Sequence, residues 1–265
     1  MNYAKDIRLA KQGVEMYKDF SVSLIVPAMN EAKTLNLVLE KVPAWVDEII
    51  VIDGNSKDDT LDTAVRNSRV SKVYVQRSKG KGAALSLGFS LASCDLIAII
   101  DADGSMDPQE LARYLDHFPN ADIVKGSRNP ILGGGSEDLT LFRDFGNRIL
   151  TNVCNLLFNQ TWTDLAYGYA VVRKNSLEQL GLSSYDNMGS VLGHKAYGQG
   201  FEIEALIFCR AANWNFKVVE VHSQEHRRIS GSSNLRAIRD GFRVLAAIAI
   251  EKCRSRPREI RIGKN

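Results

Sequence analysis

The sequence predicts an α/β fold in which a mostly parallel central sheet is covered by helices on both faces. Up to about residue 128, apolar segments of strand length alternate with single segments whose apolar residues recur three and four positions apart. Strands joined by single helices form parallel sheets that are buried on both sides. The expected strands are residues 22–26, 48–52, 72–76, 96–100 and 122–125, and the expected helices are residues 32–41, 58–67, 82–92 and 108–116.

Local signals support several of these elements. Pro108 stands in the first turn of its helix and Asp58 near the start of another, which are positions that these residue types favour. The second half of the chain is less regular, and a glycine-containing loop at 130–138 separates it from the first half. The further expected elements are helices at 141–158, 174–180, within 193–210 and at 235–254, and strands at 167–172 and 216–221.

The composition is that of a globular protein without a nucleic-acid partner. The 265 residues can bury one large core, and a net charge of +3 is too small to indicate nucleic-acid binding. No apolar run approaches the about 20 residues that span a bilayer. The four cysteines are far apart in the sequence, as expected for reduced thiols of a cytoplasmic protein. No glycine-rich phosphate loop or dinucleotide fingerprint follows a predicted strand, which disfavours a P-loop enzyme or a Rossmann dehydrogenase.

An Asp-Ala-Asp-Gly turn directly follows the apolar strand 96–100. Its two carboxylates, Asp101 and Asp103, are costly at the end of a core strand unless a cation neutralises them. Mg²⁺ and Mn²⁺ prefer oxygen ligands, and Mg²⁺ is usually held by one or two carboxylates together with substrate phosphates. The pair therefore predicts a metal–diphosphate site, and a solvated acidic turn is the alternative.

Polar residues also follow the first two predicted strands. Asn30 and Glu31 come after the first strand, and Asp53 ends the second. Helix capping accounts for each of them separately. It does not account for their gathering at one edge of the sheet, which is where ligands of open α/β sheets bind. We therefore expect a nucleotide site whose oxygens accept hydrogen bonds from a base or a ribose.

The order of these motifs resembles family 2 glycosyltransferases with the GT-A fold, which is a Rossmann-like architecture. The motifs that carry the likeness are Val-Pro-Ala-Met-Asn-Glu, Asp-Gly-Asn-Ser-Lys-Asp-Asp-Thr, Gly-Lys-Gly-Ala-Ala-Leu and Asp-Ala-Asp-Gly, followed by residues 126–128, 163–169, 201–204 and 228–235. Within the family, the chain is most similar to the branch of dolichol- and polyprenyl-phosphate hexosyltransferases.

The resemblance implies three segments. An N-terminal extension at 1–20 would precede a GT-A domain at 21–234, and a C-terminal helix with a basic tail would occupy 235–265. Within the domain, residues up to about 128 would bind the nucleotide, and residues from about 129 would bind the acceptor.

The resemblance also implies a role for each matching residue of the nucleotide half. Pro27, Asn30 and Glu31 would line the nucleotide pocket. Asp53 would accept from the base or the ribose, and Lys81 would lie beside both.

The donor diphosphate would be held by acidic and basic groups together. Asp101 and Asp103 would hold Mg²⁺ or Mn²⁺ on it, and Arg128 would sit near the acceptor or the donor phosphates. The loop that would close over the diphosphate contains Arg228, Ser232 and Asn234. Surface solvation is the alternative role of Arg128 and Arg228.

The implied reaction moves a hexose, with inversion, from a UDP- or GDP-linked donor to an acceptor. Cationic groups and Asp103 with its ion would stabilise the charge of the leaving diphosphate. A hydroxyl acceptor would need a general base, for which Asp164 and Glu204 are the candidates. A phosphate acceptor would need little help, because its second pKa is about 6. Glu204 is alternatively a helix-face carboxylate paired with an arginine.

The nature of the acceptor depends on the C-terminal helix. Gly54 and Gly104-Ser105 stand where the lipid-phosphate branch commonly has an acidic residue and a leucine-glutamine pair. The final helix is apolar on one face and basic at its end. Contact with an anionic membrane would favour a polyprenyl phosphate and a place at the inner membrane surface. A helix packed on the core would favour a soluble hydroxyl compound or a glycan.

Two further classes of protein are compatible with the sequence. A nucleotidyltransferase could use a similar sheet, although the chain lacks a glycine-rich phosphate loop near its N-terminus. A nucleotide-binding module without catalysis would bind a donor and transfer nothing. A homodimer is compatible with either class and with a glycosyltransferase.

Overall fold

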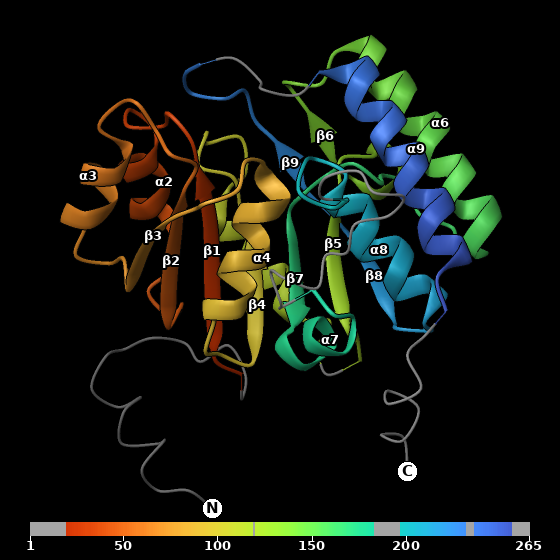
Figure 1. Cartoon of the computed structure of the whole chain (residues 1–265), viewed down its shortest axis with the longest axis horizontal. Helices are drawn as coiled ribbons and strands as arrows, with labels where there is room; N and C mark the ends of the chain where they lie inside the picture. The colour runs from red at the N-terminus through yellow and green to blue at the C-terminus, as the bar shows by residue number, and fades with distance from the viewer. Residues whose placement is uncertain (1–19, 119, 183–196, 232–235, 256–265) are drawn as a thin grey trace, which may run out of the picture.

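The structure is a computed structural model that describes residues 20–118, 120–182, 197–231 and 236–255 (Figure 1). A seven-stranded sheet with the strand order β3-β2-β1-β4-β7-β5-β8 forms its centre. Its strands are β1 Val22–Ala28, β2 Glu48–Asp53, β3 Lys72–Val75, β4 Leu96–Ile99, β5 Ile123–Ser127, β7 Ala170–Arg173 and β8 Val218–His222. Neighbouring strands pair in parallel except at β7, which runs antiparallel to both β4 and β5.

Helices cover both faces of this sheet and bury two hydrophobic clusters. The helices are α2 Leu35–Lys41, α3 Thr60–Arg66, α4 Lys81–Leu91, α5 Leu111–Leu115, α6 Leu141–Phe158, α7 Lys174–Gln179, α8 Ile203–Asn213 and α9 Ala237–Cys253, with short 3₁₀ turns η1 Pro108–Glu110 and η2 Pro130–Leu132. One cluster lies under α2, α3 and α5. The other lies under α4, α7 and α8 and includes residues of α6 and α9.

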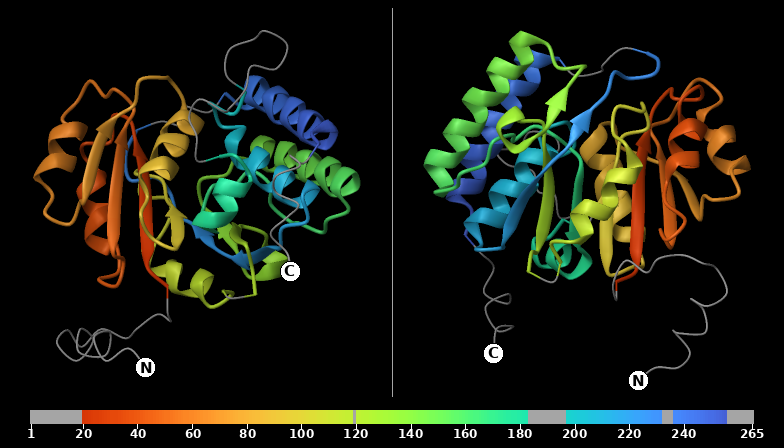
Figure 2. Two further views of the ribbon diagram at one scale, coloured as in Figure 1. Left: turned by 60° about the horizontal axis from the view of Figure 1, so that its bottom comes forward. Right: turned by 180° about the vertical axis from the view of Figure 1, so that it is seen from behind.

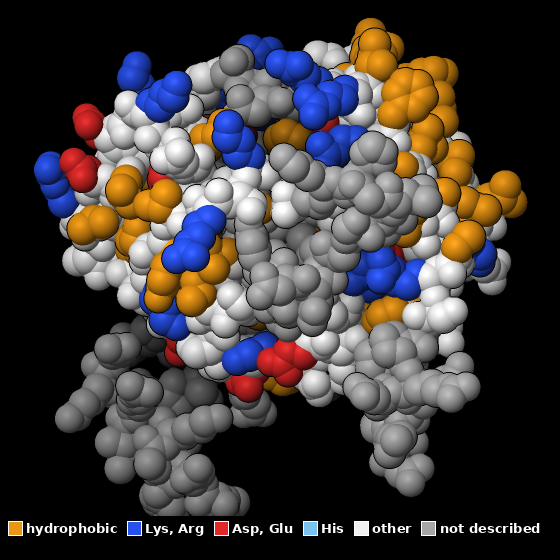
Figure 3. Space-filling model, viewed as in Figure 1, with side chains coloured by type: hydrophobic (Ala, Val, Ile, Leu, Met, Phe, Trp, Pro, Cys, Tyr) orange, Lys and Arg blue, Asp and Glu red, His pale blue; other side chains and the backbone are white. Residues whose placement is uncertain are grey.

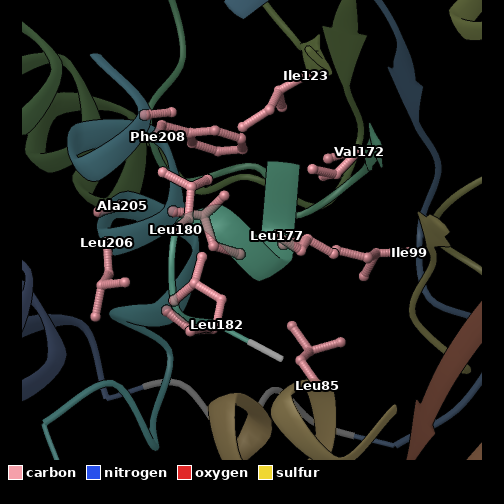
Figure 4. Packing of buried hydrophobic residues seen from close by; sticks show 14 of the residues in the cluster. Leu85, Ile99, Ile123, Val172, Leu177, Leu180, Leu182, Ala205, Leu206 and Phe208 are labelled. Atoms are coloured by element: carbon pink, nitrogen blue, oxygen red, sulfur yellow. The ribbon is translucent and has the colours of Figure 1, made fainter. Parts of the chain in front are cut away.

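The two clusters follow from the alternation of side chains along the strands. On β1, Ile25 points into one cluster, whereas Leu24 and Val26 point into the other. Every residue of β2 is buried, as expected for a strand covered on both faces. In the cluster beneath α8, Leu177 and Leu180 lie between Ile99 and Phe208, so α7 fills the space between the sheet and α8 (Figure 4).

The predicted mostly parallel sheet with helices on both faces is confirmed, and the five N-terminal strands lie where the sequence placed them. Three details differ. The strand expected at 167–172 begins only at Ala170, and its antiparallel direction was not predicted. The loop expected at 130–138 contains η2 and a short strand β6 Gly135–Ser136, which pairs with β9 Gln224–Glu225 in a second sheet. The helix expected within 193–210 is α8, which ends later, at Asn213.

The helices α6 and α9 lie side by side at one end of the molecule, far from α2 and α3 (Figures 1 and 2). Within the described ranges, we find no helix with the length and apolar character needed to cross a membrane. Residues 1–19 and 256–265 lie outside the described residues, and so do most of the predicted N-terminal extension and basic tail.

Candidate functional site

The loops that follow β1 and β2 are joined by hydrogen bonds. The backbone N–H of Lys57 donates to Asn30 Oδ1 at 2.8 Å, and the N–H of Asn30 donates to Ser56 Oγ at 2.9 Å. Asn30 has a φ of 59°, in the left-handed region that asparagine tolerates better than most residues. Pro27 lies just before this loop, within β1 and opposite Ile52. The two predicted strand-end motifs therefore form one continuous rim.

Asp53 is buried at this rim with one oxygen satisfied and one not. Its Oδ2 accepts from the N–H of Ser56 at 3.0 Å, whereas Oδ1 has no hydrogen-bond partner among the described residues. The neighbouring Gln76 donates its N–H to the carbonyl of Asp53, and its own buried Oε1 also lacks a described partner. Buried acceptors without donors are rare and costly in native proteins. Gln76 could not be predicted from the sequence, because a single glutamine after a strand forms no motif.

Glu31 lies on the same side as the Asp101–Asp103 pair. Burial raises the pKa of Glu31, and the negative charges of Asp103 and Asp101 raise it further, against the hydrogen bond from Thr34. The carboxylates of Asp101 and Asp103, which follow β4, thus act electrostatically on Glu31, which follows β1.

Lys81 bridges Asp101 and Glu204. Its Nζ lies 2.7 Å from Asp101 Oδ1 and 2.7 Å from Glu204 Oε1, and the Lys81 side chain is only 10% exposed. Burial lowers the pKa of Lys81, but the two carboxylates outweigh it and raise the pKa above its ordinary value. A Cβ at Gly168 would stand 2.3 Å from Glu204 Oε1, so the bridge requires glycine there. The structure therefore places Lys81 between two carboxylates, and its position beside a base and ribose stays a prediction.

Asp103 is fixed by its own turn and by Arg228. Asp103 Oδ1 accepts from the N–H and the hydroxyl of Ser105 at 3.0 and 2.7 Å. Asp103 Oδ2 lies 3.2 Å from Arg228 Nη2, and Arg228 Nε lies 3.4 Å from Asp138 Oδ2. Arg228 thus contacts one predicted metal ligand and an acidic residue that stands just before α6.

Arg128 and Asp164 form a second buried pair. Asp164 accepts from Arg128 Nε at 2.7 Å, from Arg128 Nη2 at 3.0 Å and from Asn147 Nδ2 at 2.8 Å. The Arg128 side chain is 8% exposed, also contacts Glu225 and lies over the ring of Tyr167. Burial alone would raise the pKa of Asp164, but the charge and hydrogen bonds of Arg128 lower it to about 2.

Both predicted general bases are paired with cations, Asp164 with Arg128 and Glu204 with Lys81. Both oxygens of Asp164 are occupied by donors, and its low pKa makes it a weak base. Burial raises the pKa of Glu204, but its Oε1 accepts from Lys81. Asn147, which ties α6 to Asp164, was not identified from the sequence.

A cavity of about 350 Å³ opens above these charged groups. Its inner end is lined by Lys81, Asp101, Arg128 and Arg228, and its walls carry the apolar side chains of α6 and α9. The wall residues include Phe142, Ile149, Leu150, Ile238, Phe242 and Leu245. The charged site therefore opens directly into an apolar groove between two helices.

Apolar side chains continue from this groove onto the surface of the molecule. Phe142 and Phe145 of α6 are 63% and 64% exposed, and Ile238 and Phe242 of α9 are 68% and 69% exposed. Figure 3 shows hydrophobic side chains gathered where α6 and α9 lie. The opposite face of α9 packs on the core, where Ile248 is fully buried. The sequence left membrane contact and core packing as alternatives for this helix; in the structure, α9 packs one face on the core and leaves a second, apolar face exposed.

The acidic donor set is compatible with a divalent ion. Among the described residues, no group of three or more His, Cys, Asp or Glu side chains is arranged to hold a metal. A pair of carboxylates nevertheless suffices for Mg²⁺ when substrate phosphates complete the shell. Asp101 and Asp103 provide such a pair. Ser232 and Asn234 of the predicted closing loop lie outside the described residues.

A mostly parallel sheet with a carboxylate pair after its central strand is the architecture of GT-A glycosyltransferases. The sequence model of "Glycosyl transferase family 2" matches residues 23–181, which is more than half of the chain. The chain belongs to this family and is a glycosyltransferase.

Named relatives place the chain near enzymes of polyprenyl-phosphate chemistry. It is 30% identical over 209 residues to a polyprenol monophosphomannose synthase of Mycolicibacterium smegmatis, covering 75% of this chain and 74% of the relative. It is 27% identical over 223 residues to an undecaprenyl-phosphate mannosyltransferase of Micrococcus luteus, covering 81% and 87%. Among solved structures, glucosyl-3-phosphoglycerate synthase of Mycobacterium tuberculosis, in complex with Mn²⁺, UDP-glucose and phosphoglyceric acid, aligns with a TM-score of 0.67 at 20% identity, covering 89% and 81%.

The depressed pKa of Asp164 predicts a pH-dependent contribution to stability. Because its pKa falls from an ordinary 3.8 to about 2 on folding, the charged form stabilises the fold above pH ~4, and this is lost as the pH falls towards 2. The contribution is about 2 kcal/mol. Chemical denaturation of the wild type and Asp164→Asn should show a stability difference that is largest above pH ~5 and shrinks by about this amount at low pH. A difference in stability that stays constant with pH would contradict the lowered pKa of Asp164.

Proposed function

We propose that this glycosyltransferase moves a hexose, with inversion, from a UDP- or GDP-linked donor to a polyprenyl phosphate. The observation that carries the proposal is the apolar groove between α6 and α9, whose inner end is formed by the charged site. A soluble hydroxyl compound or glycan is polar and would not bury the apolar side chains of these walls. An isoprenoid chain would bury them, and its phosphate would stand at the charged end.

The rim formed by the loops after β1 and β2 supports a nucleoside diphosphate as the donor. The unpaired Oδ1 of Asp53 requires an N–H or O–H donor, which the edge of a base or a ribose hydroxyl supplies. Asn30 and Glu31 flank it in the same rim. The Mn²⁺ and UDP-glucose bound to the mycobacterial structural neighbour agree with a nucleotide-sugar donor.

Asp101 and Asp103 would hold Mg²⁺ or Mn²⁺ in this proposal. A divalent ion on them would supply positive charge against the leaving diphosphate. Arg228 would add a second positive charge from the loop before α9, because it already reaches Asp103. Lys81 would keep Asp101 oriented, since it contacts Asp101 from the side of α4.

The state of the two candidate bases supports a phosphate acceptor. A hydroxyl acceptor must lose a proton to a base, and both Asp164 and Glu204 are already paired with buried cations. A phosphate monoester has a second pKa of about 6 and is mostly dianionic at neutral pH, so it attacks without a base. Asp164 would then hold Arg128 in place rather than accept a proton.

The same groove supports peripheral contact with a membrane. The exposed apolar faces of α6 and α9 surround its mouth, and Arg143 and the exposed Arg148 lie on α6 beside them. Apolar side chains that enter the headgroup region beside cationic ones are typical of interfacial helices. We propose that these faces rest on the inner membrane surface and admit the lipid from it.

Nucleotide release tests the donor, the ion and the acceptor together. With UDP- and GDP-sugars and Mn²⁺ or Mg²⁺, we expect release of nucleoside diphosphate to rise at least about tenfold when undecaprenyl phosphate is added. Asp103→Asn should lose about 10²-fold or more of the activity, because charge on the leaving group is no longer offset. Asp62→Asn, an exposed charge change on α3, is the matched control. Transfer to sugar alcohols or glycans without lipid would refute the proposed acceptor.

Vesicle binding tests the membrane face. Replacing Phe242 by Ser removes a 69%-exposed apolar side chain at the mouth of the groove. We expect it to weaken co-sedimentation with anionic vesicles about tenfold or more, since a buried aromatic side chain contributes roughly 1.5–3 kcal/mol. Val65→Ser is the control, because Val65 is 65% exposed on the distant α3. Equal binding by both variants would contradict a role for the α9 face.

A further inference from the structure

Each carboxylate of the proposed ion site already has a cationic partner within the chain. Lys81 Nζ is 2.7 Å from Asp101, and Arg228 Nη2 is 3.2 Å from Asp103. Each cation is shared with a second carboxylate, Glu204 for Lys81 and Asp138 for Arg228. A free divalent ion that approached Asp101 and Asp103 would meet both of these positive charges.

The contact between Arg228 and Asp103 is built into the backbone. The N–H of Ile229 donates to the carbonyl of Asp103 at 3.0 Å, and the N–H of His226 donates to the carbonyl of Ser105 at 2.8 Å. Gly104 has a φ of +80°, and a Cβ there would come within 2.5 Å of Ile229 Cδ1. The segment around Arg228 therefore lies directly on the carboxylate turn, and Gly104 permits this close approach.

Ser105 leaves only one oxygen of Asp103 for an external ligand. The N–H and the hydroxyl of Ser105 both donate to Asp103 Oδ1, whereas Arg228 contacts Asp103 Oδ2. An ion bound through Oδ2 would stand within one contact distance of the guanidinium. Like charges at such a distance repel strongly in a half-buried site.

We propose that Arg228 makes this site bind a divalent ion together with a diphosphate and disfavours the ion alone. The inference rests on the proposed donor and ion site. A diphosphate brings negative oxygens that face the ion and Arg228 at once, so the repulsion is offset when both are present. Ion and nucleotide then bind cooperatively, and the coupling is reciprocal.

Mn²⁺ titrations with and without UDP test the proposal, read out by the electron paramagnetic resonance signal of free Mn²⁺. Without UDP, Arg228→Gln should bind Mn²⁺ roughly three- to tenfold more tightly than the wild type, because a partly buried cation beside the ligand is removed. With UDP present, the wild type should bind Mn²⁺ more tightly than Arg228→Gln, because the variant lacks the contact of Arg228 with the diphosphate. The factor by which UDP tightens Mn²⁺ binding should therefore fall.

Arg227→Gln is the matched control, because it removes the same charge from the exposed neighbouring residue. Arg228→Lys keeps the positive charge and should bind Mn²⁺ about as tightly as the wild type. This variant separates the effect of the charge from misfolding caused by a substitution at this position. If Arg228→Gln binds Mn²⁺ no more tightly than Arg227→Gln without UDP, the proposal about Arg228 is overturned. If the wild type binds no Mn²⁺ even with UDP, or Asp103→Asn binds it as well as the wild type, the proposed ion site itself fails.

Discussion

The buried bridge from Asp101 through Lys81 to Glu204 joins the first half of the chain to the second. Lys81 begins α4 and Asp101 follows β4, whereas Glu204 belongs to α8, which supports α9 and the groove. Removing one partner of such a pair leaves an uncompensated buried charge, which typically costs 3–5 kcal/mol. The bridge therefore sets where the carboxylate pair stands relative to the groove. Gly168 leaves the space that the bridge needs.

A second set of buried charges centres on Arg128. Arg128 is neutralised by Asp164 and Glu225, so it organises the inner wall and does not offer a free positive charge. Asn147 connects this network to α6. Asp164 is paired with Arg128, and Glu204 with Lys81. In our proposal the acceptor therefore arrives already ionised, and the apolar helices beyond this network bind its lipid chain.

Much of the fold and the position of the carboxylate turn could be predicted from the sequence because the signals are local. Apolar strands that alternate with helices predict the sheet, and Asp101 and Asp103 follow directly from the end of one strand. The contacts of Lys81 could not be predicted, because its partner Glu204 is 123 residues away. The antiparallel β7, the role of Asn147 and the two faces of α9 likewise depend on packing between distant segments. The spacing of apolar residues shows that a helix or strand has an apolar face, but it does not show which segment packs on that face.

We propose that the carboxylate turn after β4 carries a metal–diphosphate site that opens into the apolar groove between α6 and α9. A crystal structure with Mn²⁺ and UDP, with Mn²⁺ located by anomalous scattering, is the sharpest test of this site. We expect a Mn²⁺ peak at Asp103 Oδ2, Arg228 turned from that oxygen towards the diphosphate, and a hydrogen bond from the nucleoside to Asp53 Oδ1. UDP bound elsewhere, or Mn²⁺ bound away from Asp101 and Asp103, would contradict it.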